Sequence, residues 1–213
     1  MKNQIISLFA VSLLFCSCQE KPKDYIKQIN PENYYPDISQ GVTVKQSNEG
    51  IKKIDSALNA NTLNKYLPKV WVTDKFGKKI NLQAEIEENT LLTFNSIHCS
   101  FCKIAFFELL PLVMDSLKSR KTVNSIYPIL SSRGLSNKKD SIIHSNYKFR
   151  MDTLYPNYYT IDLLEENKLN IIANPFFLYL NSEQQVTAIK TGVNPDDPMA
   201  LYKQIVENLE LDK

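Results

Sequence analysis

The sequence predicts an α/β domain on three observations. A continuous apolar run at 90–95 has the composition of a buried central strand. A Cys-x-x-Cys pair follows it directly and is itself followed by a helical apolar period over 103–119. Two pairs of short β-rich runs flank turn-forming segments and are typical of hairpins. These runs are 70–73 with 79–82, and 176–180 with 186–190.

The remaining elements follow from periodicity and turn residues. Pro111 lies inside the helical period after the cysteines, so a kink is expected there. Ile51, Ile54, Leu58 and Leu63 have helical spacing, and we expect that segment at the edge of the domain. The other expected elements are a short strand at 42–44, a buried strand at 123–130, a loop at 131–137, a helix at 140–149 and an amphipathic helix at 198–209.

The N-terminus predicts an exported lipoprotein. A positively charged start precedes an apolar run at 5–15, which has the length of a signal-peptide core and is too short to span a membrane. The run ends in Ser17-Cys18, which resembles a bacterial lipobox with Cys18 as the lipid-bearing residue. An ordinary secretory signal that ends in cysteines is the alternative.

The domain boundaries follow from this start. Polar residues and prolines between 19 and 50 favour an extended spacer. The expected divisions are a lipoprotein signal peptide at 1–17, a lipid-anchored tether and edge segment at 18–66, and a folded domain at 67–213.

Composition argues against two classes of function. The 213-residue chain carries a formal net charge of only +2, which gives no electrostatic argument for a nucleic-acid partner. Its 5 glycines are too few for a glycine-rich phosphate loop. We therefore expect neither nucleic-acid binding nor a nucleotide site built on such a loop.

The cysteines predict the chemistry. Of the 4 in the chain, Cys16 leaves with the signal and Cys18 carries lipid, so the mature protein keeps Cys99 and Cys102. Cys99 lies at the expected start of a helix, where unpaired N–H groups and the positive end of the dipole stabilise a thiolate. Cys99 is therefore the expected nucleophile, and Cys102, one turn further along, is the expected buried resolving thiol.

Two other roles for this pair were considered. A structural disulfide would close a very short loop, where the loss of chain entropy stabilises least. A zinc site needs about four ligands, and only His98 and His144 could add imidazoles to the two thiols. His98 is better explained as a neighbour that tunes the ionisation of Cys99. We expect no metal and no cofactor beyond the redox-active disulfide Cys99–Cys102.

A second signal is Asn174-Pro175, which directly precedes the apolar run at 176–180. A proline at the entrance of a buried strand cannot donate to the strand ladder. One solution is a cis peptide bond, which in proteins is a deliberate feature of X-Pro pairs. Downstream of a Cys-x-x-Cys pair, this proline is an expected part of the same site.

Together these motifs resemble the thioredoxin superfamily over residues 67–210, and in particular its TlpA-type, membrane-anchored bacterial branch. The resemblance implies a central mixed β-sheet flanked by helices, with an N-terminal β-hairpin extension. It also implies a nucleophilic Cys99, a resolving Cys102, and Asn174 with a cis Pro175 where substrates bind. The matching features are Thr73-Asp74 and Gly77 in the first hairpin, Leu91-Leu92-Thr93-Phe94 before the cysteines, Pro175 with Phe177-Leu178, and Gly192.

The sequence also departs from the family pattern. The family usually has an aromatic residue near the position of Ile97-His98 and often a proline between the cysteines. Thr93 stands where thioredoxin has a buried acid, and Asn174 stands where threonine or valine usually precedes the proline. These departures bear on redox potential and partner choice rather than on the fold.

The expected function is that of an extracytoplasmic thiol-disulfide oxidoreductase. The resemblance implies exported protein thiols and disulfides as partners, an upstream membrane electron donor, and attachment through lipid on Cys18 to the periplasm-facing side of a Gram-negative-type cell envelope. A thioredoxin-fold copper chaperone and a non-catalytic binding module are the alternatives. Family copper chaperones typically space their cysteines by three residues, whereas here the spacing is two.

Overall fold

A computed structural model describes most of the chain. The described residues are 22–30, 33, 44–86, 88–120, 125–131, 138–192, 197, 199, 200, 202, 203 and 205. The expected signal peptide at 1–17, the lipidation site Cys18 and most of the expected loop at 131–137 lie outside them.

A seven-stranded mixed sheet forms the centre of the molecule, in the order β2-β1-β5-β4-β3-β6-β7. Strand β3 pairs in parallel with β4 and antiparallel with β6, and β4 pairs in parallel with β5. The predicted mixed sheet with flanking helices is therefore confirmed. The strands are β1 (Trp71–Asp74), β2 (Lys79–Asn81), β3 (Thr90–Ser96), β4 (Ser125–Ser131), β5 (Tyr159–Ile161), β6 (Phe176–Leu180) and β7 (Val186–Thr191).

The predicted hairpin before the cysteines is β1–β2, and its turn is explained by two residues. Asp74 accepts hydrogen bonds at Oδ1 from the backbone N–H of Phe76 (2.9 Å) and of Lys78 (2.8 Å). Gly77 has φ +86°, a conformation that side chains other than glycine rarely adopt. The hairpin adds to the sheet through antiparallel pairing of β1 with β5.

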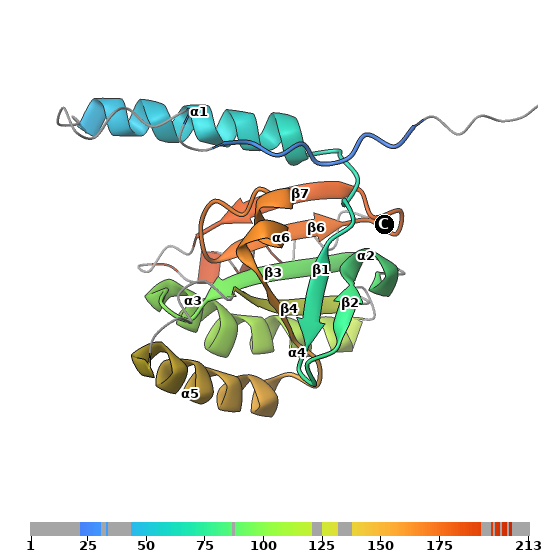
Figure 1. Cartoon of the computed structure of the whole chain (residues 1–213), viewed down its shortest axis with the longest axis vertical. Coiled ribbons are helices and arrows are strands. Elements are labelled where there is room, and N and C mark those ends of the chain that lie inside the picture. The colour runs from blue at the N-terminus through green and yellow to red at the C-terminus, as the bar shows by residue number, and fades with distance from the viewer. Residues whose placement is uncertain are drawn as a thin grey trace, which may run out of the picture.

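Helices cover both faces of the sheet (Figure 1). Side chains of β3 alternate between two apolar clusters, as expected for a strand buried on both faces. Leu92 and Phe94 face a cluster with Leu58 of α1, and Leu91 faces a cluster with Leu110 of α4 and Met151 of α5. The helices are α1 (Val44–Thr62), α2 (Leu82–Glu85), α3 (Ser100–Ile104), a π-helical turn η3 (Ala105–Leu109), α4 (Leu110–Arg120), α5 (Lys138–Leu154) and α6 (Leu163–Lys168).

The irregularity expected at Pro111 takes the form of the π turn η3. Leu110 donates its backbone N–H to the carbonyl of Ala105, five residues back. The next donor in that register would be Pro111, which has no N–H. The carbonyl of Phe106 is instead hydrogen-bonded by the hydroxyl of Tyr155, a residue of which only 1% is exposed. Burial raises the pKa of Tyr155, so the phenol remains a donor.

The N-terminal segment 22–30 corrects the prediction of an extended spacer. Ile26 donates its N–H to the carbonyl of Tyr66 (3.0 Å), and Tyr66 donates back to Asp24 (2.9 Å). Ile26 and Ile29 are buried in the domain's core cluster. The spacer prediction was wrong for these residues because the local composition does not indicate that Ile26 and Ile29 pack into the domain's core.

Other elements depart from the predictions in smaller ways. The edge helix expected from Ile51 to Leu63 is α1, which begins at Val44, so the strand expected at 42–44 is wrong at Val44; 42 and 43 lie outside the described residues. The short elements β5 and α6 were not predicted, and α5 is longer than the expected 140–149. Of the expected helix at 198–209, residues 199, 200, 202, 203 and 205 are described and helical.

Candidate functional site

The two cysteines lie at the carboxyl end of the central strand. Strand β3 ends at Ser96, whose carbonyl accepts the N–H of Cys99 (3.2 Å), and α3 begins at Ser100. Cys99 is the N-cap residue of this helix, and its Sγ accepts the backbone N–H of Cys102 (3.1 Å). The cysteines form a disulfide with their Cα atoms 5.2 Å apart. The strand-to-helix junction therefore presents Cys99 at the start of a continuous helical run.

The two sulfur-bearing residues differ in exposure. Cys99 is half-buried, whereas Cys102 is 0% exposed. Between them, Ser100 and Phe101 are exposed on the surface, with Phe101 43% exposed. Cys99 and the ring of Phe101 are therefore accessible from the surface, whereas Cys102 is not.

The expected cis peptide bond at Asn174–Pro175 is present. The carbonyl oxygen of Asn174 lies 3.3 Å from Sγ of Cys99, across 75 residues of sequence. Pro175 in turn accepts the N–H of Gly192 at its carbonyl (2.8 Å), and Gly192 has the φ of +73° that favours glycine. The structure thus brings Asn174 and Pro175 together with the disulfide.

The two histidines that the sequence singled out have different positions. His98 is exposed and adjoins Cys99, and its backbone N–H donates to Oγ of Ser96 (3.4 Å). His144 lies in α5. Within the described part of the chain, no group of three or more His, Cys, Asp or Glu side chains is placed to hold a metal ion. The role of His98 as a tuning residue stays a prediction.

Sequence reasoning missed Asn95, one of several residues around this strand whose buried polar atoms have no hydrogen-bond partner among the described residues. Thr93 and Asn95 are both 0% exposed, and among the described residues Thr93 Oγ1 and both side-chain atoms of Asn95 have no hydrogen-bond partner. Oδ1 of Asn174 is also buried without a partner there. The available signal was the asparagine itself, since a polar amide inside a fully buried strand is unusual.

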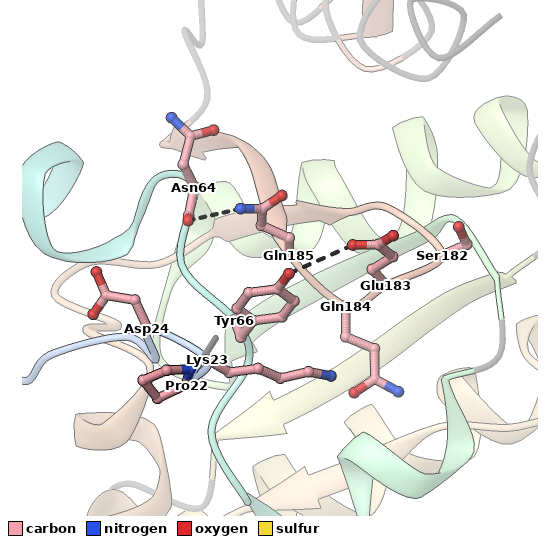
Figure 2. Close-up of a pocket in the computed structure, with 9 residues that line it drawn as sticks. All are labelled: Pro22, Lys23, Asp24, Asn64, Tyr66, Ser182, Glu183, Gln184 and Gln185. Atoms are coloured by element: carbon pink, nitrogen blue, oxygen red, sulfur yellow. Dashed lines mark hydrogen bonds between the residues drawn. The ribbon is translucent and has the colours of Figure 1, made fainter. Parts of the chain in front are cut away.

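A pocket of about 680 Å³ lies elsewhere, at the turn between β6 and β7 (Figure 2). Figure 2 shows Tyr66 between Lys23 on one side and Glu183 and Gln185 on the other. Residue 180, at the end of β6 beside this turn, pairs with Thr90 at the start of β3, whereas the disulfide follows the end of β3. The pocket is therefore at the opposite end of the sheet from the cysteines.

Comparison with solved structures identifies the architecture. A thiol:disulfide interchange protein from Bacteroides sp. superimposes with a TM-score of 0.50 at 16% identity, covering 70% of this chain and 91% of its own. The chain has the thioredoxin fold. The strand–Cys-x-x-Cys–helix unit and the cis proline are the features that the resemblance stated above leads one to expect, and the structural neighbours include thiol:disulfide interchange proteins.

Two further structures are similar at the same low identity. The thioredoxin domain of a thiol-disulfide oxidoreductase from Bacteroides vulgatus has 16% identity and a TM-score of 0.46, over 68% of this chain and 98% of its own. The copper-bound ScoI of Arabidopsis thaliana has 13% identity and a TM-score of 0.48, over 68% and 98%. No protein-family model and no curated protein sequence matches the chain.

Proposed function

We propose that this protein is a thiol-disulfide oxidoreductase that exchanges disulfides with exported proteins through Cys99 and Cys102. The observation that carries the proposal is the unequal exposure of the two cysteines, one half-buried and one fully buried, at the start of one helix. Thiol–disulfide exchange through a mixed disulfide requires one accessible attacking sulfur and a second sulfur that partners do not reach.

In the reduced protein, the thiolate of Cys99 attacks one sulfur of the partner's disulfide. That S–S bond breaks, a Cys99–partner disulfide forms, and the departing partner sulfur takes up a proton from solvent. The Cys102 thiolate then attacks Sγ of Cys99 and releases the second partner thiol. The partner gains two electrons and two protons, and Cys99 and Cys102 become the disulfide. The same steps in reverse oxidise a partner dithiol.

Backbone groups around Cys99 support this role. The N–H of Cys102 points at Sγ of Cys99 and stabilises negative charge on it, as does the positive end of the helix. The Asn174 carbonyl accepts the S–H of Cys99 when that thiol is protonated. Because Asn174 and Pro175 border the reacting sulfur, a partner chain bound there contacts both.

The cellular setting belongs to the same proposal. A signal peptide at 1–17 exports the chain, lipid on Cys18 holds it at the periplasm-facing side of the envelope, and a membrane electron donor reduces the disulfide. The motifs at 5–18 support the anchor. Among the described residues, no helix combines the length and the apolar character needed to cross a membrane. Mass spectrometry of the mature N-terminus tests the anchor, since an unmodified N-terminus other than Cys18 contradicts it.

Single cysteine variants test the mechanism. Cys102→Ala is expected to accumulate disulfide-linked complexes with partner proteins, because attack by Cys99 proceeds but resolution does not. Cys99→Ala is expected to accumulate at least about tenfold fewer, because Cys102 is buried. Non-reducing gel electrophoresis of cell extracts measures both, and the Cys99→Ala/Cys102→Ala double variant gives the background.

Two outcomes contradict the assignment. Equal trapping by both single variants means that the roles of the two sulfurs are wrong. Unchanged reduction of insulin disulfides by the double variant means that the dithiol is not catalytic, and the non-catalytic binding module then replaces the enzyme.

A further inference from the structure

A groove of about 230 Å³ lies beside the dithiol, between the helix that carries Cys102 and α5. One side is formed by Lys103, the residue directly after Cys102, and by Phe107 one turn later. The other side is formed by Asn146, Tyr147 and Arg150 of α5. We call these five residues the basic groove. Neither the proposed exchange reaction nor the expected cis-proline site uses any of them.

The floor of the basic groove is aromatic and rigid. The rings of Phe107 and Tyr147 have centroids 4.7 Å apart, and both residues are buried. The guanidinium of Arg150 lies 3.9 Å from the centre of the Phe107 ring, a cation–π contact. This contact holds the guanidinium against the ring and leaves its N–H groups to bind an anion.

Side chains of the groove carry hydrogen-bond donors that have no acidic partner among the described residues. In the described part of the chain, no carboxylate forms an ion pair with Lys103 or Arg150. The hydroxyl of Tyr147 is buried and has no hydrogen-bond partner among the described residues, although its side chain is only 3% exposed. Burial raises the pKa of Tyr147, so this phenol is a donor at neutral pH. An unpaired buried donor costs free energy until a ligand satisfies it.

We propose that the basic groove binds the carboxylate of an acidic residue that lies close to the reactive cysteine of the partner protein. This inference rests on the proposed function, because it names a feature of the partners of the same dithiol. Two cations, one phenol and the amide of Asn146 form a donor set that a carboxylate matches. The groove is open at the surface and is lined by Lys103, the residue after Cys102, so a side chain of a bound polypeptide can enter it.

Helix geometry sets the spacing between that acid and the partner's cysteine. With a rise of about 1.5 Å per residue, Lys103 lies about 6 Å along the helix from Cys99, and Phe107 about 12 Å. An extended partner strand advances about 3.3 Å per residue. The acidic residue is therefore expected about two to four positions from the partner's cysteine.

Paired peptides test the proposal with the whole chain, reduced with dithiothreitol and then freed of it. Two peptides carry one cysteine as a mixed disulfide with thionitrobenzoate, and differ only by Glu or Gln three positions from that cysteine. Attack by Cys99 on the peptide sulfur releases thionitrobenzoate, whose absorbance gives the rate constant. At low ionic strength the Glu peptide is expected to react about tenfold faster, which is about 1.4 kcal/mol in activation free energy. This preference is expected to shrink as salt is added.

Variants locate the effect in the groove. Arg150→Gln is expected to abolish most of the preference, and Lys148→Gln, which removes the same charge from an exposed α5 residue outside the groove, is expected to leave it intact. Tyr147→Phe removes only the unpaired hydroxyl, so the variant is expected to fold with unchanged stability but to lose part of the preference.

The outcomes separate this inference from the proposed function. No reaction with either peptide contradicts the oxidoreductase itself. Equal rates for the Glu and Gln peptides overturn the groove proposal while the oxidoreductase stands. An equal loss of preference in Lys148→Gln and Arg150→Gln also overturns it, because the effect then comes from general charge and not from the groove.

Discussion

Two buried asparagines, one in the turn after α6 and one in β3, have opposite hydrogen-bonding states. Asn170 is 2% exposed, and its side chain makes three hydrogen bonds of 2.9 Å: Oδ1 accepts from the N–H of Ile29, and Nδ2 donates to Lys27 O and to Thr62 Oγ1. Asn95 is 0% exposed, and neither atom of its side-chain amide has a partner among the described residues.

The hydrogen bonds of Asn170 explain why a polar side chain is buried there, whereas no stabilising bond explains the burial of Asn95. Asn170 joins the N-terminal segment, α1 and the loop after α6, and two of its bonds satisfy the N–H of buried Ile29 and the hydroxyl of buried Thr62. Asn95 lies one residue before the end of the strand that leads to Cys99 and contributes no such bond. Unsatisfied buried polar groups in native proteins concentrate at functional sites, and Cys99 lies four residues after Asn95.

Asn170→Ala is expected to have the largest effect on stability. It leaves an N–H, a carbonyl and a hydroxyl without their partner, and it places alanine at φ +56°. The expected loss is on the order of 4 kcal/mol in the free energy of unfolding, measured by urea denaturation.

Asn64→Ala is the matched control, because Asn64 has φ +59° but an exposed side chain. Its expected cost is about 1 kcal/mol, from the backbone conformation alone. Similar losses in the two variants would mean that the hydrogen bonds of Asn170 contribute little.

Tyr155→Phe is expected to have an intermediate effect. The Tyr155 hydroxyl donates a hydrogen bond to the Phe106 carbonyl, and both residues belong to the apolar cluster that packs against the helix after the cysteines. Tyr155 is therefore a second buried side chain, like Asn170, whose polar atom has a partner. Removing the hydroxyl leaves a buried carbonyl unpaired, at an expected cost of about 2 kcal/mol in urea denaturation. Tyr147→Phe, which removes an unpartnered hydroxyl, is expected to change stability by less than about 0.5 kcal/mol. A larger loss of unfolding free energy in Tyr147→Phe than in Tyr155→Phe would contradict the view that the paired hydroxyl stabilises the fold more than the unpaired one.

Asn95→Val is expected to leave the free energy of unfolding nearly unchanged or to raise it. No hydrogen bond is lost, and valine suits a buried strand. Unfolding free energy is expected to stay within about 1 kcal/mol of the wild type or to rise. A loss approaching that of Asn170→Ala would show that the Asn95 amide is satisfied after all, and the comparison would then fail.

The sequence predicted an element correctly where an apolar run or a turn residue within that segment determines the structure. The apolar run at 90–95, the turn around Gly77 and the hairpin at 176–190 predicted elements that the structure contains. Strand β5 and helix α6 are only 3 and 6 residues long, which is too short for an alternating or a helical pattern of apolar residues to be recognised. Pro111 predicted an irregular helix but not a π-helical turn. In that turn the Tyr155 hydroxyl donates a hydrogen bond to the Phe106 carbonyl, a contact that the local sequence does not indicate.

The packing of residues 22–30 against the domain depends on non-local contacts. The partners of Ile26 and Ile29 are Tyr66 and Asn170, and the second lies 141 residues away from Ile29 in the chain. No composition of the segment 22–30 indicates that pairing. A chain shortened to begin at residue 67 would therefore expose part of the core.

The positions of the two cysteines and of the cis proline were predictable from the sequence, whereas the residues around them were not. Cys99, Cys102 and Pro175 are marked by spacing and by position relative to strands, and the structure brings them together. Asn95 and the basic groove depend on which side chains meet across elements, and Arg150 lies 48 residues from Cys102 in sequence. Contacts between side chains of distant elements depend on the tertiary structure, and the periodicity of the sequence does not predict them.

The N-terminal segment also has a mechanical consequence. It is hydrogen-bonded beside Tyr66, which bridges Gln185 at the turn after β6, whereas the disulfide lies at the other end of β3 (Figure 1). A force applied to the N-terminus would load the backbone bonds of Asp24 and Ile26 to Tyr66 first. These bonds and the three side-chain bonds of Asn170 are expected to break before the strand pairs of β3. Pulling on the N-terminus is therefore expected to detach this segment before it disturbs the strand that leads to Cys99.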